Sequence, residues 1–263
     1  MSNLLVKGRQ GRAIAAVTPA SANWAYVGFA AYRLQPGECV VFEDPSREAC
    51  LVVLSGQARV QAGDLDCGTL GGRQTVFDEI APDAAYVPNN CPIKATAVTA
   101  CEIAIADAPG FGTYPARVIP GATMRRSVRG EGSNLRYVTD ILPDDQPADS
   151  LLVVEVVTPP SHSSSYPPHK HDADDMPRES ALEETYYHRL NPPQGYVLQR
   201  VYTDDRSLDE AIVAEDHDVV MVPKGYHPVT VPHGYTSYYF NVMAGARRNW
   251  VFRNDPAHEW MIR

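Results

Sequence analysis

Hydrophobic residues along the chain form short runs that are bounded by glycine or proline. Five such runs are "CLVVLSG" (50–56), "LLVVEVVTPP" (151–160), "GYVLQRVYT" (195–203), "DVVMVPKG" (218–225) and "YTSYYFNVMAG" (235–245). Each has the length of a β-strand and is rich in valine, tyrosine or isoleucine. No long segment combines a 3.6-residue hydrophobic period with helix caps. The pattern therefore predicts an all-β fold, a sandwich or barrel built from many short strands.

Two strand-dense halves are separated by a segment that is rich in glycine, proline and arginine, "PGFGTYPARVIPGATMRRSVRGEGSNLRYV" (109–138). Each half contains a strand run, a Val-Pro turn at 87–88 or 222–223, and another strand run. We therefore expect two domains, residues 1–125 and residues 126–263.

Composition narrows the choice of partners and location. The net charge of −9 argues against nucleic acid and anionic membranes as partners, and an anionic substrate would need a local basic pocket. No apolar run approaches the roughly 20 residues of a membrane span, and no signal peptide is recognised. The five cysteines are widely spaced without a Cys-x-x-Cys motif, which is typical of reduced thiols in the cytoplasm.

Candidate metal ligands gather in the second half, where all eight histidines lie. In "YPPHKHD" (166–172), His169 and His171 would point to the same side of a strand and could bind one metal ion. Lys170 between them would point the other way and is expected to be solvated. The Pro-x-Gly turn of "VPKGYHPV" (222–229) delivers His227, with His233 in "VPHGY" as its rival.

A carboxylate ligand is expected from "LEETYYHRL" (182–190). Glu183 and Glu184 point to opposite faces of the predicted strand, so only one of them can join the histidines. Glu179 is a weaker third candidate. Strand alternation alone leaves this choice open.

The order His-x-His, Glu, Pro-x-Gly, His resembles the motifs of cupins. A wider match resembles the 5-deoxy-glucuronate isomerase family of bacterial myo-inositol breakdown, a bicupin family related to 5-keto-4-deoxyuronate isomerase. The resemblance is dense in "SSYPPHKHD" (164–172), "LEETYYHRLNPPQGY" (182–196), "QRVYTDDRSLDE" (199–210), "VPKGYHPV" (222–229) and "YYFNVMAG" (238–245). The first half matches more loosely, best in "RRSVRGEGSNLRYV" (125–138).

This resemblance implies two tandem cupin-like β-barrels, a bicupin. The first barrel would be degenerate and metal-free, and the second would be catalytic. It implies that one divalent metal ion per chain is held by His169, His171, His227 and, in preference to its neighbour, Glu184. Zinc or manganese is favoured over iron, cobalt or nickel. No organic cofactor is expected, because the chain has no dinucleotide fingerprint and no P-loop.

The implied reaction is the aldose–ketose isomerisation of 5-deoxy-D-glucuronate to 5-dehydro-2-deoxy-D-gluconate. Candidates for moving the proton are Tyr186, Glu183, His188 and His233, and a metal-assisted hydride shift, which needs no such base, is the alternative. Candidates for binding the substrate carboxylate are Arg200, Arg189 and Arg247. The linker arginines Arg125, Arg126, Arg129 and Arg136 would reach the site only if the linker folds back. A homo-oligomer is expected. The alternatives are a cupin dioxygenase using Fe(II) and a non-catalytic sugar-acid-binding bicupin.

Overall fold

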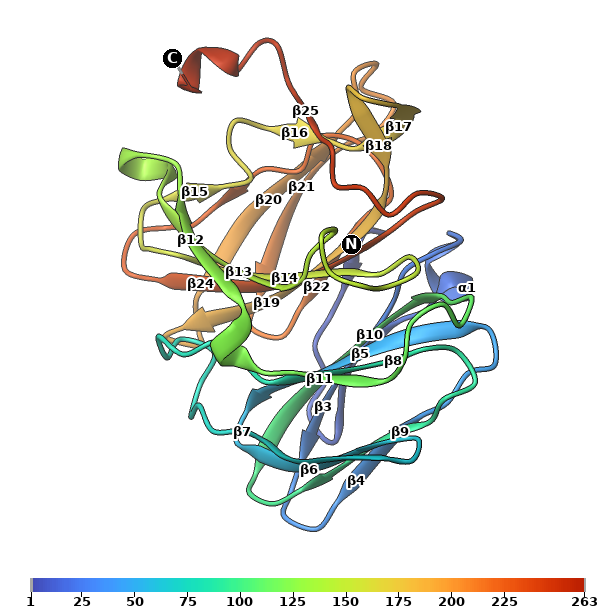
Figure 1. Ribbon diagram of the computed structural model, residues 1–263. Coiled ribbons are helices and arrows are strands. Elements are labelled where there is room, and N and C mark those ends of the chain that lie inside the picture. The colour runs from blue at the N-terminus through green and yellow to red at the C-terminus, as the bar shows by residue number, and fades with distance from the viewer. Residues whose placement is uncertain (1, 263) are drawn as a thin grey trace.

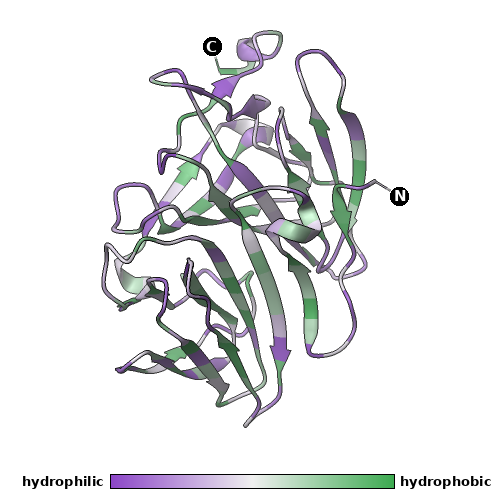
Figure 2. Ribbon diagram, turned by 90° about the vertical axis from the view of Figure 1, so that its right-hand side faces the viewer, coloured by the Kyte–Doolittle hydropathy of each residue, from purple (hydrophilic) through white to green (hydrophobic). Residues whose placement is uncertain are grey.

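The structure is a computed structural model that describes residues 2–262. It is nearly all-β, which confirms the predicted fold class, and its two strand-dense halves are stacked on one another (Figure 1). Figure 2 shows hydrophobic positions concentrated in the strands and hydrophilic positions in many of the connecting loops. The short helical elements are α1 (Pro19–Ala22), η1 (Gly121–Thr123), η2 (Gly132–Asn134) and η3 (Glu259–Ile262).

The first half consists of two antiparallel sheets. The six-stranded sheet has the order β11 (Arg117–Ile119), β8 (Ala84–Val87), β5 (Arg47–Ser55), β10 (Cys101–Pro109), β3 (Gly28–Leu34) and β2 (Ala13–Val17). The four-stranded sheet has the order β4 (Cys39–Phe42), β9 (Ile93–Ala97), β6 (Gln57–Ala62) and β7 (Leu65–Gly71).

The second half repeats this plan with additional short ladders. Its seven-stranded sheet has the order β1 (Leu5–Val6), β22 (Val219–Val222), β19 (Glu183–Asn191), β24 (Thr236–Ala244), β14 (Leu152–Thr158), β13 (Arg136–Leu142) and β12 (Arg125–Arg129). The facing sheet has the order β15 (Ser163–Ser164), β23 (Val229–Thr230), β20 (Tyr196–Tyr202) and β21 (Asp209–Glu215). Two further ladders pair β16 (His169–Lys170) with β25 (Arg253–Asn254), and β17 (Asp172–Asp175) with β18 (Glu179–Ala181).

Three hydrophobic cores hold these layers together. One core lies inside each half, and the third lies between the six-stranded and seven-stranded sheets. Alternation along the strands explains how one strand serves two cores. In β24, Tyr238 and Phe240 face the core between the halves, whereas Tyr239 and Met243 face the interior of the second half. Both faces of the large sheets are therefore buried, and the halves share one continuous hydrophobic interface.

The arginine-rich linker does fold back. Strands β12 and β13 form a hairpin that extends the seven-stranded sheet, beginning at Arg125. Sheet membership therefore changes between β11 and β12, close to the expected boundary at residues 125 and 126. Strand β1 of the first segment nevertheless pairs with β22 of the second half, so the exact division into domains stays a prediction.

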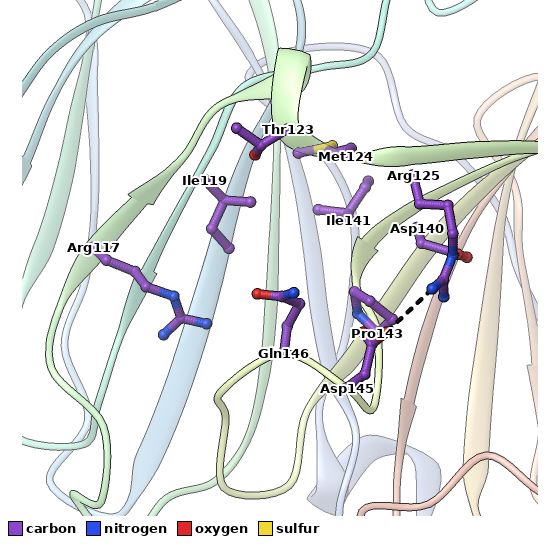
Figure 3. Close-up of a pocket in the computed structure, with 10 residues that line it drawn as sticks. All are labelled: Arg117, Ile119, Thr123, Met124, Arg125, Asp140, Ile141, Pro143, Asp145 and Gln146. Atoms are coloured by element: carbon purple, nitrogen blue, oxygen red, sulfur yellow. Dashed lines mark hydrogen bonds and ion pairs between the residues drawn. The ribbon is translucent and has the colours of Figure 1, made fainter.

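A cavity of about 160 Å³ lies where the chain passes from β11 of the six-stranded sheet to β12 of the seven-stranded sheet (Figure 3). Arg117 and Gln146 lie on its wall, and Arg125 forms ion pairs there with Asp140 and Asp145. It is separate from the histidine cluster described below. All five cysteines are free thiols. Among residues 2–262, no helix is long and apolar enough to cross a membrane.

Candidate metal centre

Three histidines from two separate segments meet inside the second half. His169 and His171 come from the β16 segment, and His227 follows the turn after β22. One ring nitrogen from each of them lies within 4.8 Å of the others, and all three side chains are buried. The structure therefore brings together the three histidines that the sequence pattern selected.

Backbone carbonyls determine which nitrogen of two of these rings faces the cluster. His171 Nδ1 lies 3.2 Å from the Leu182 carbonyl oxygen, and His227 Nδ1 lies 2.8 Å from the Gly225 carbonyl oxygen. A carbonyl can only accept, so each Nδ1 must carry the hydrogen and donate it. Each neutral ring therefore directs the lone pair of its Nε2 into the cluster, as a metal-ligating histidine does.

Glu184 faces these lone pairs. Its Oε2 lies 3.1 Å from His171 Nε2 and 3.2 Å from His227 Nε2. His227 Nε2 is buried and has no hydrogen-bond partner among residues 2–262. Lone pairs of a carboxylate and a neutral imidazole repel one another unless a cation lies between them. Three nitrogens and one carboxylate oxygen are a suitable ligand set for zinc, manganese or another divalent transition metal.

Low pKa values keep two of the three rings neutral, as metal binding requires. Burial lowers the pKa of His227 to about 4, and burial together with His227 and His171 lowers the pKa of His169 well below its usual value. For His171, burial would lower the pKa, but the contact with Glu184 outweighs it and the pKa is raised. A proton on His171 and a metal ion would therefore compete for the same position.

The two adjacent glutamates point in opposite directions, as strand alternation requires. Glu184 faces the histidines, whereas the Glu183 carboxylate accepts hydrogen bonds from the backbone N–H groups of Ala25, Tyr26 and Val27, at 2.7, 2.8 and 3.0 Å. Glu183 therefore ties the first half to the second. It faces away from the histidines, although it was a candidate for moving the proton.

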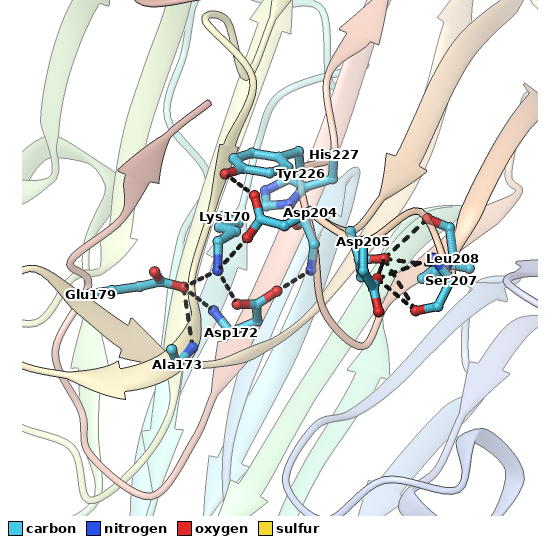
Figure 4. A network of polar contacts seen from close by, with 12 residues as sticks. Lys170, Asp172, Ala173, Glu179, Asp204, Asp205, Ser207, Leu208, Tyr226 and His227 are labelled. Carbon is cyan, nitrogen blue, oxygen red and sulfur yellow. Dashed lines mark hydrogen bonds and ion pairs between the residues drawn. The ribbon is translucent and has the colours of Figure 1, made fainter. Parts of the chain in front are cut away.

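Lys170 is buried, and the prediction of a solvated lysine is wrong. Its Nζ lies 2.6 Å from Asp172 Oδ1, 3.3 Å from Glu179 Oε1 and 3.6 Å from Asp204 Oδ2 (Figure 4). Asp172 also accepts a hydrogen bond from the backbone N–H of Gly225 at 2.7 Å. The alternation placed Lys170 opposite its histidine neighbours, but carboxylates of the following residues 172–179 and of Asp204 surround it on that side. The network links the His-x-His segment to the turn that carries His227.

The remaining candidates for proton transfer differ in location. A small pocket adjoins the histidine cluster, and Tyr186, His169 and Glu184 are among its lining residues. The Tyr186 hydroxyl lies 3.1 Å from Ser165 Oγ. His188 is buried behind it, 3.0 Å from Gln199 Oε1, and does not line the pocket. His233 lies outside it, with its Nδ1 3.4 Å from Ser161 Oγ.

The three arginines selected for the substrate carboxylate lie outside this pocket. Arg200 forms an ion pair with Asp209 on β21, and Arg247 is an exposed side chain near Asp174. Arg189 is held by Glu102 and Asp216 where the halves meet. The arginines that do line the pocket are Arg129 and Arg136 of the linker hairpin. The sequence contained a signal for them, the arginine-rich linker itself, but the pattern could not show that it folds back.

Comparison with known proteins identifies the relatives of this chain. The model of the KduI/IolB family matches residues 4–261. The 5-deoxy-glucuronate isomerase of Geobacillus thermodenitrificans is 53% identical over 246 residues, which are 94% of this chain and 90% of the relative. The enzyme of the same name from Bacillus subtilis strain 168 is 47% identical over 247 residues, which are 94% and 91% of the two chains.

Solved structures show the same fold. An IolB-like protein from Salmonella typhimurium LT2 superposes with a TM-score of 0.98, at 47% identity, over 100% of both chains. Oxalate decarboxylase from Bacillus subtilis superposes with a TM-score of 0.65 at 13% identity, over 97% of this chain and 78% of the other, which shows a shared fold alone. The resemblance seen in the sequence motifs is thereby confirmed, and the chain belongs to the KduI/IolB family.

Proposed function

We propose that this protein is a metal-dependent aldose–ketose isomerase that converts 5-deoxy-D-glucuronate to 5-dehydro-2-deoxy-D-gluconate in inositol catabolism. The observation that carries the proposal is the buried cluster of His169, His171 and His227, with the Glu184 carboxylate in contact with the last two. Curated relatives named 5-deoxy-glucuronate isomerase cover most of the chain at 47–53% identity, which supports the choice of reaction.

The four clustered side chains would hold one divalent ion per chain. Such an ion polarises a carbonyl and stabilises negative charge that develops on the adjacent oxygens of a sugar. The rest of the chemistry falls to the pocket. Isomerisation moves a hydrogen between neighbouring carbons, and where it moves as a proton, Tyr186, which lines the pocket with His169 and Glu184, is our candidate to carry it. Val138, Val154 and Val156 form an apolar wall that limits access of water to the reacting carbons.

Zinc or manganese is our choice for the ion, because imidazole nitrogens and a carboxylate oxygen suit both. The structurally similar oxalate decarboxylase has Mn(II) centres, but at 13% identity the likeness concerns the fold. We further infer a cytoplasmic homo-oligomer. The free cysteines support the location, and light scattering on the purified protein tests the oligomeric state.

A single set of measurements tests the isomerase proposal. Metal content and turnover of 5-deoxy-D-glucuronate would be measured without oxygen for the wild type, His227→Ala and His233→Ala. We expect anaerobic turnover with one metal ion per chain, loss of both in His227→Ala, and neither change in His233→Ala. An oxygen requirement would favour a dioxygenase, and a metal-replete protein without turnover would favour a binding protein.

A further inference from the structure

The pocket beside the candidate metal ligands is lined by two arginines from one hairpin. Arg129 and Arg136 are directly opposite each other in the pairing of β12 with β13, so their side chains leave the same face of the hairpin. Both line the pocket together with His169, Glu184 and Tyr186. Glycine at position 130 makes this arrangement possible, because a Cβ there would lie 2.8 Å from Arg136 Nη1 and the residue has φ +78.

Arg136 lacks the partner that a half-buried guanidinium normally has. Its Nη1 donates to the Asn134 carbonyl oxygen at 3.0 Å, and no carboxylate of residues 2–262 forms an ion pair with it. Burial lowers the pKa of Arg136, and the neighbouring Arg129 acts in the same direction. Two like charges are thus held together on one wall without enough negative charge, an arrangement that favours an anionic ligand.

The arginines are not neutralised by their other neighbours. Arg129 has a long ion pair with Asp140, at 3.7 Å, and Asp140 is already bound by Arg125 at 2.7 Å. Otherwise Arg129 lies over the ring of Trp250, 5.3 Å from its centroid.

Trp250 adds a further donor. Its indole Nε1 is buried at the pocket and has no partner among residues 2–262. The unsatisfied groups on this wall are therefore N–H donors. A ligand that satisfies them must bring acceptor oxygens, and a carboxylate is the fork-shaped acceptor that matches a guanidinium.

We propose that Arg136, assisted by Arg129 and the indole N–H of Trp250, is the subsite that binds the carboxylate of a sugar-acid substrate. The inference rests on the proposed function, because the substrate of that reaction would be held at both of its ends. One end of the open-chain sugar lies at the histidine cluster and the other at the hairpin arginines. This local positive wall also answers the question raised by the net charge of −9, because an anionic substrate needs such a pocket.

The unfilled space imposes one condition on binding. The pocket holds only about 30 Å³, which is room for a single water molecule or a carboxylate group. A carboxylate group therefore fits there as the pocket stands, whereas a whole sugar acid needs more space than this pocket provides.

The test compares acidic and neutral ligands. Wild type, Arg136→Met and Arg136→Lys would be assayed with 5-deoxy-D-glucuronate and with its uncharged counterpart, 5-deoxy-D-glucose. For Arg136→Met we expect kcat/KM to fall roughly 10- to 100-fold for the acid and to stay unchanged for the neutral sugar. Arg136→Lys should restore part of the loss, because an ammonium keeps the charge without the fork. Arg126→Met is the matched control, since Arg126 leaves the opposite face of the same hairpin and is exposed.

Equal losses with both sugars would show a structural role for Arg136 and overturn the proposal, as would no loss with either. A binding measurement distinguishes failure of the carboxylate subsite from failure of the proposed isomerase function. Calorimetry on metal-replete protein would use the C1-reduced analogue of the acid, which cannot isomerise, and the matching neutral polyol. If the wild type turns over neither sugar, the proposed function fails. Preference for the acidic analogue that disappears in Arg136→Met would still support the carboxylate subsite, and absence of preference in the wild type would refute it.

Discussion

The two halves of the chain have the same strand plan but different interiors. The order β8-β5-β10-β3-β2 in the first half corresponds to β22-β19-β24-β14-β13 in the second. Ala49 pairs with Val87, the residue before Pro88, just as Glu184 pairs with Val222, the residue before Pro223. Alanine thus occupies in the first half the position that Glu184 occupies in the second.

This correspondence continues along the strand. Ala49, Leu51 and Val53 belong to the hydrophobic core of the first half. The matching residues of the second half are Glu184, Tyr186 and His188, which carry a carboxylate, a hydroxyl and an imidazole. One framework thus supports a closed aliphatic core in one copy and a polar site in the other.

The connections between strands differ even more. Residues 43–46 join β4 to β5, whereas residues 165–182 join β15 to β19. The longer connection carries His169, His171 and two of the carboxylates around Lys170, those of Asp172 and Glu179. The candidate site therefore combines a longer connection with a few polar residues on a strand framework that both halves share.

Glu184→Ala, which makes the second half resemble the first, should have the largest effect. Removing the carboxylate leaves three imidazoles without an anionic ligand, so we expect metal to be lost and kcat to fall on the order of 10³-fold. The fold should persist, because alanine occupies the corresponding position of the first half. Metal content, steady-state kinetics and circular dichroism check this. Retained metal and activity would show that Glu184 is not a ligand.

Breaking the buried contact between the halves should have the largest effect on stability. Arg73 from the first half binds Glu155 of the second, with N–O distances of 3.0 and 2.8 Å and with both side chains almost fully buried. Arg73→Met would leave a buried carboxylate unpaired and should lower the free energy of unfolding by roughly 3–5 kcal/mol. Denaturant unfolding measures it. The double variant Arg73→Met/Glu155→Leu should recover most of the loss, and failure to recover would indicate a packing effect instead.

Glu183→Gln sharpens the contrast between adjacent glutamates. Its carboxylate binds three backbone N–H groups of residues 25–27, so we expect a loss of about 1–3 kcal/mol in the free energy of unfolding. Metal content should remain at the wild-type level, because this side chain faces away from the histidines. A variant with normal stability that no longer binds metal would show that the two glutamates have been assigned the wrong roles.

Features set by local pattern were predictable from the sequence, and features set by distant pairing were not. The all-β fold, the approach of His169 and His171, and the delivery of His227 by its turn follow from strand alternation and turn chemistry. The ligand roles themselves stay predictions. Alternation also separated Glu183 from Glu184, but it could not show that Glu183 binds the first half, because that contact spans more than 150 positions along the chain.

The arginines considered for substrate binding show the same limit. Arg200 was a candidate because its guanidinium could bind a carboxylate, yet its side chain forms an ion pair with Asp209 instead. Arg129 and Arg136 reach the pocket only because the linker pairs as a hairpin and adds to the sheet. Lys170 was assigned to solvent because the sequence shows its side of the strand but not the acidic loop that covers it.

The smallest expected effect concerns pH and the polar contacts between the halves. The His217 ring lies 2.8 Å from the Asp216 carboxylate and 3.4 Å from the Glu102 carboxylate. The Arg33 guanidinium lies 3.2 Å from the same ring, and Arg189 forms ion pairs with both carboxylates. Burial would lower the pKa of His217, but its hydrogen bonds to Asp216 and Glu102 outweigh burial and the charge of Arg189, so its pKa is raised. Burial opposes ionisation of the two carboxylates, yet their contacts with His217 and Arg189 lower the pKa of both.

The sign of the pH effect follows from these directions. A raised pKa means that protonated His217 stabilises the fold fully below its unfolded pKa of about 6.5, and that this contribution is lost as the pH rises through the higher folded value. Both carboxylates remain ionised over this range, and their contributions would be lost only under more acidic conditions. We therefore expect the stability difference between wild type and His217→Asn to shrink from about pH 5.5 to about pH 8.5. Asparagine is the suitable replacement because residue 217 has φ +71, which asparagine tolerates better than most residues. Urea unfolding of both proteins across this range measures the difference, and a difference that grows with pH would mean that the two arginines, rather than the carboxylates, dominate the environment of His217.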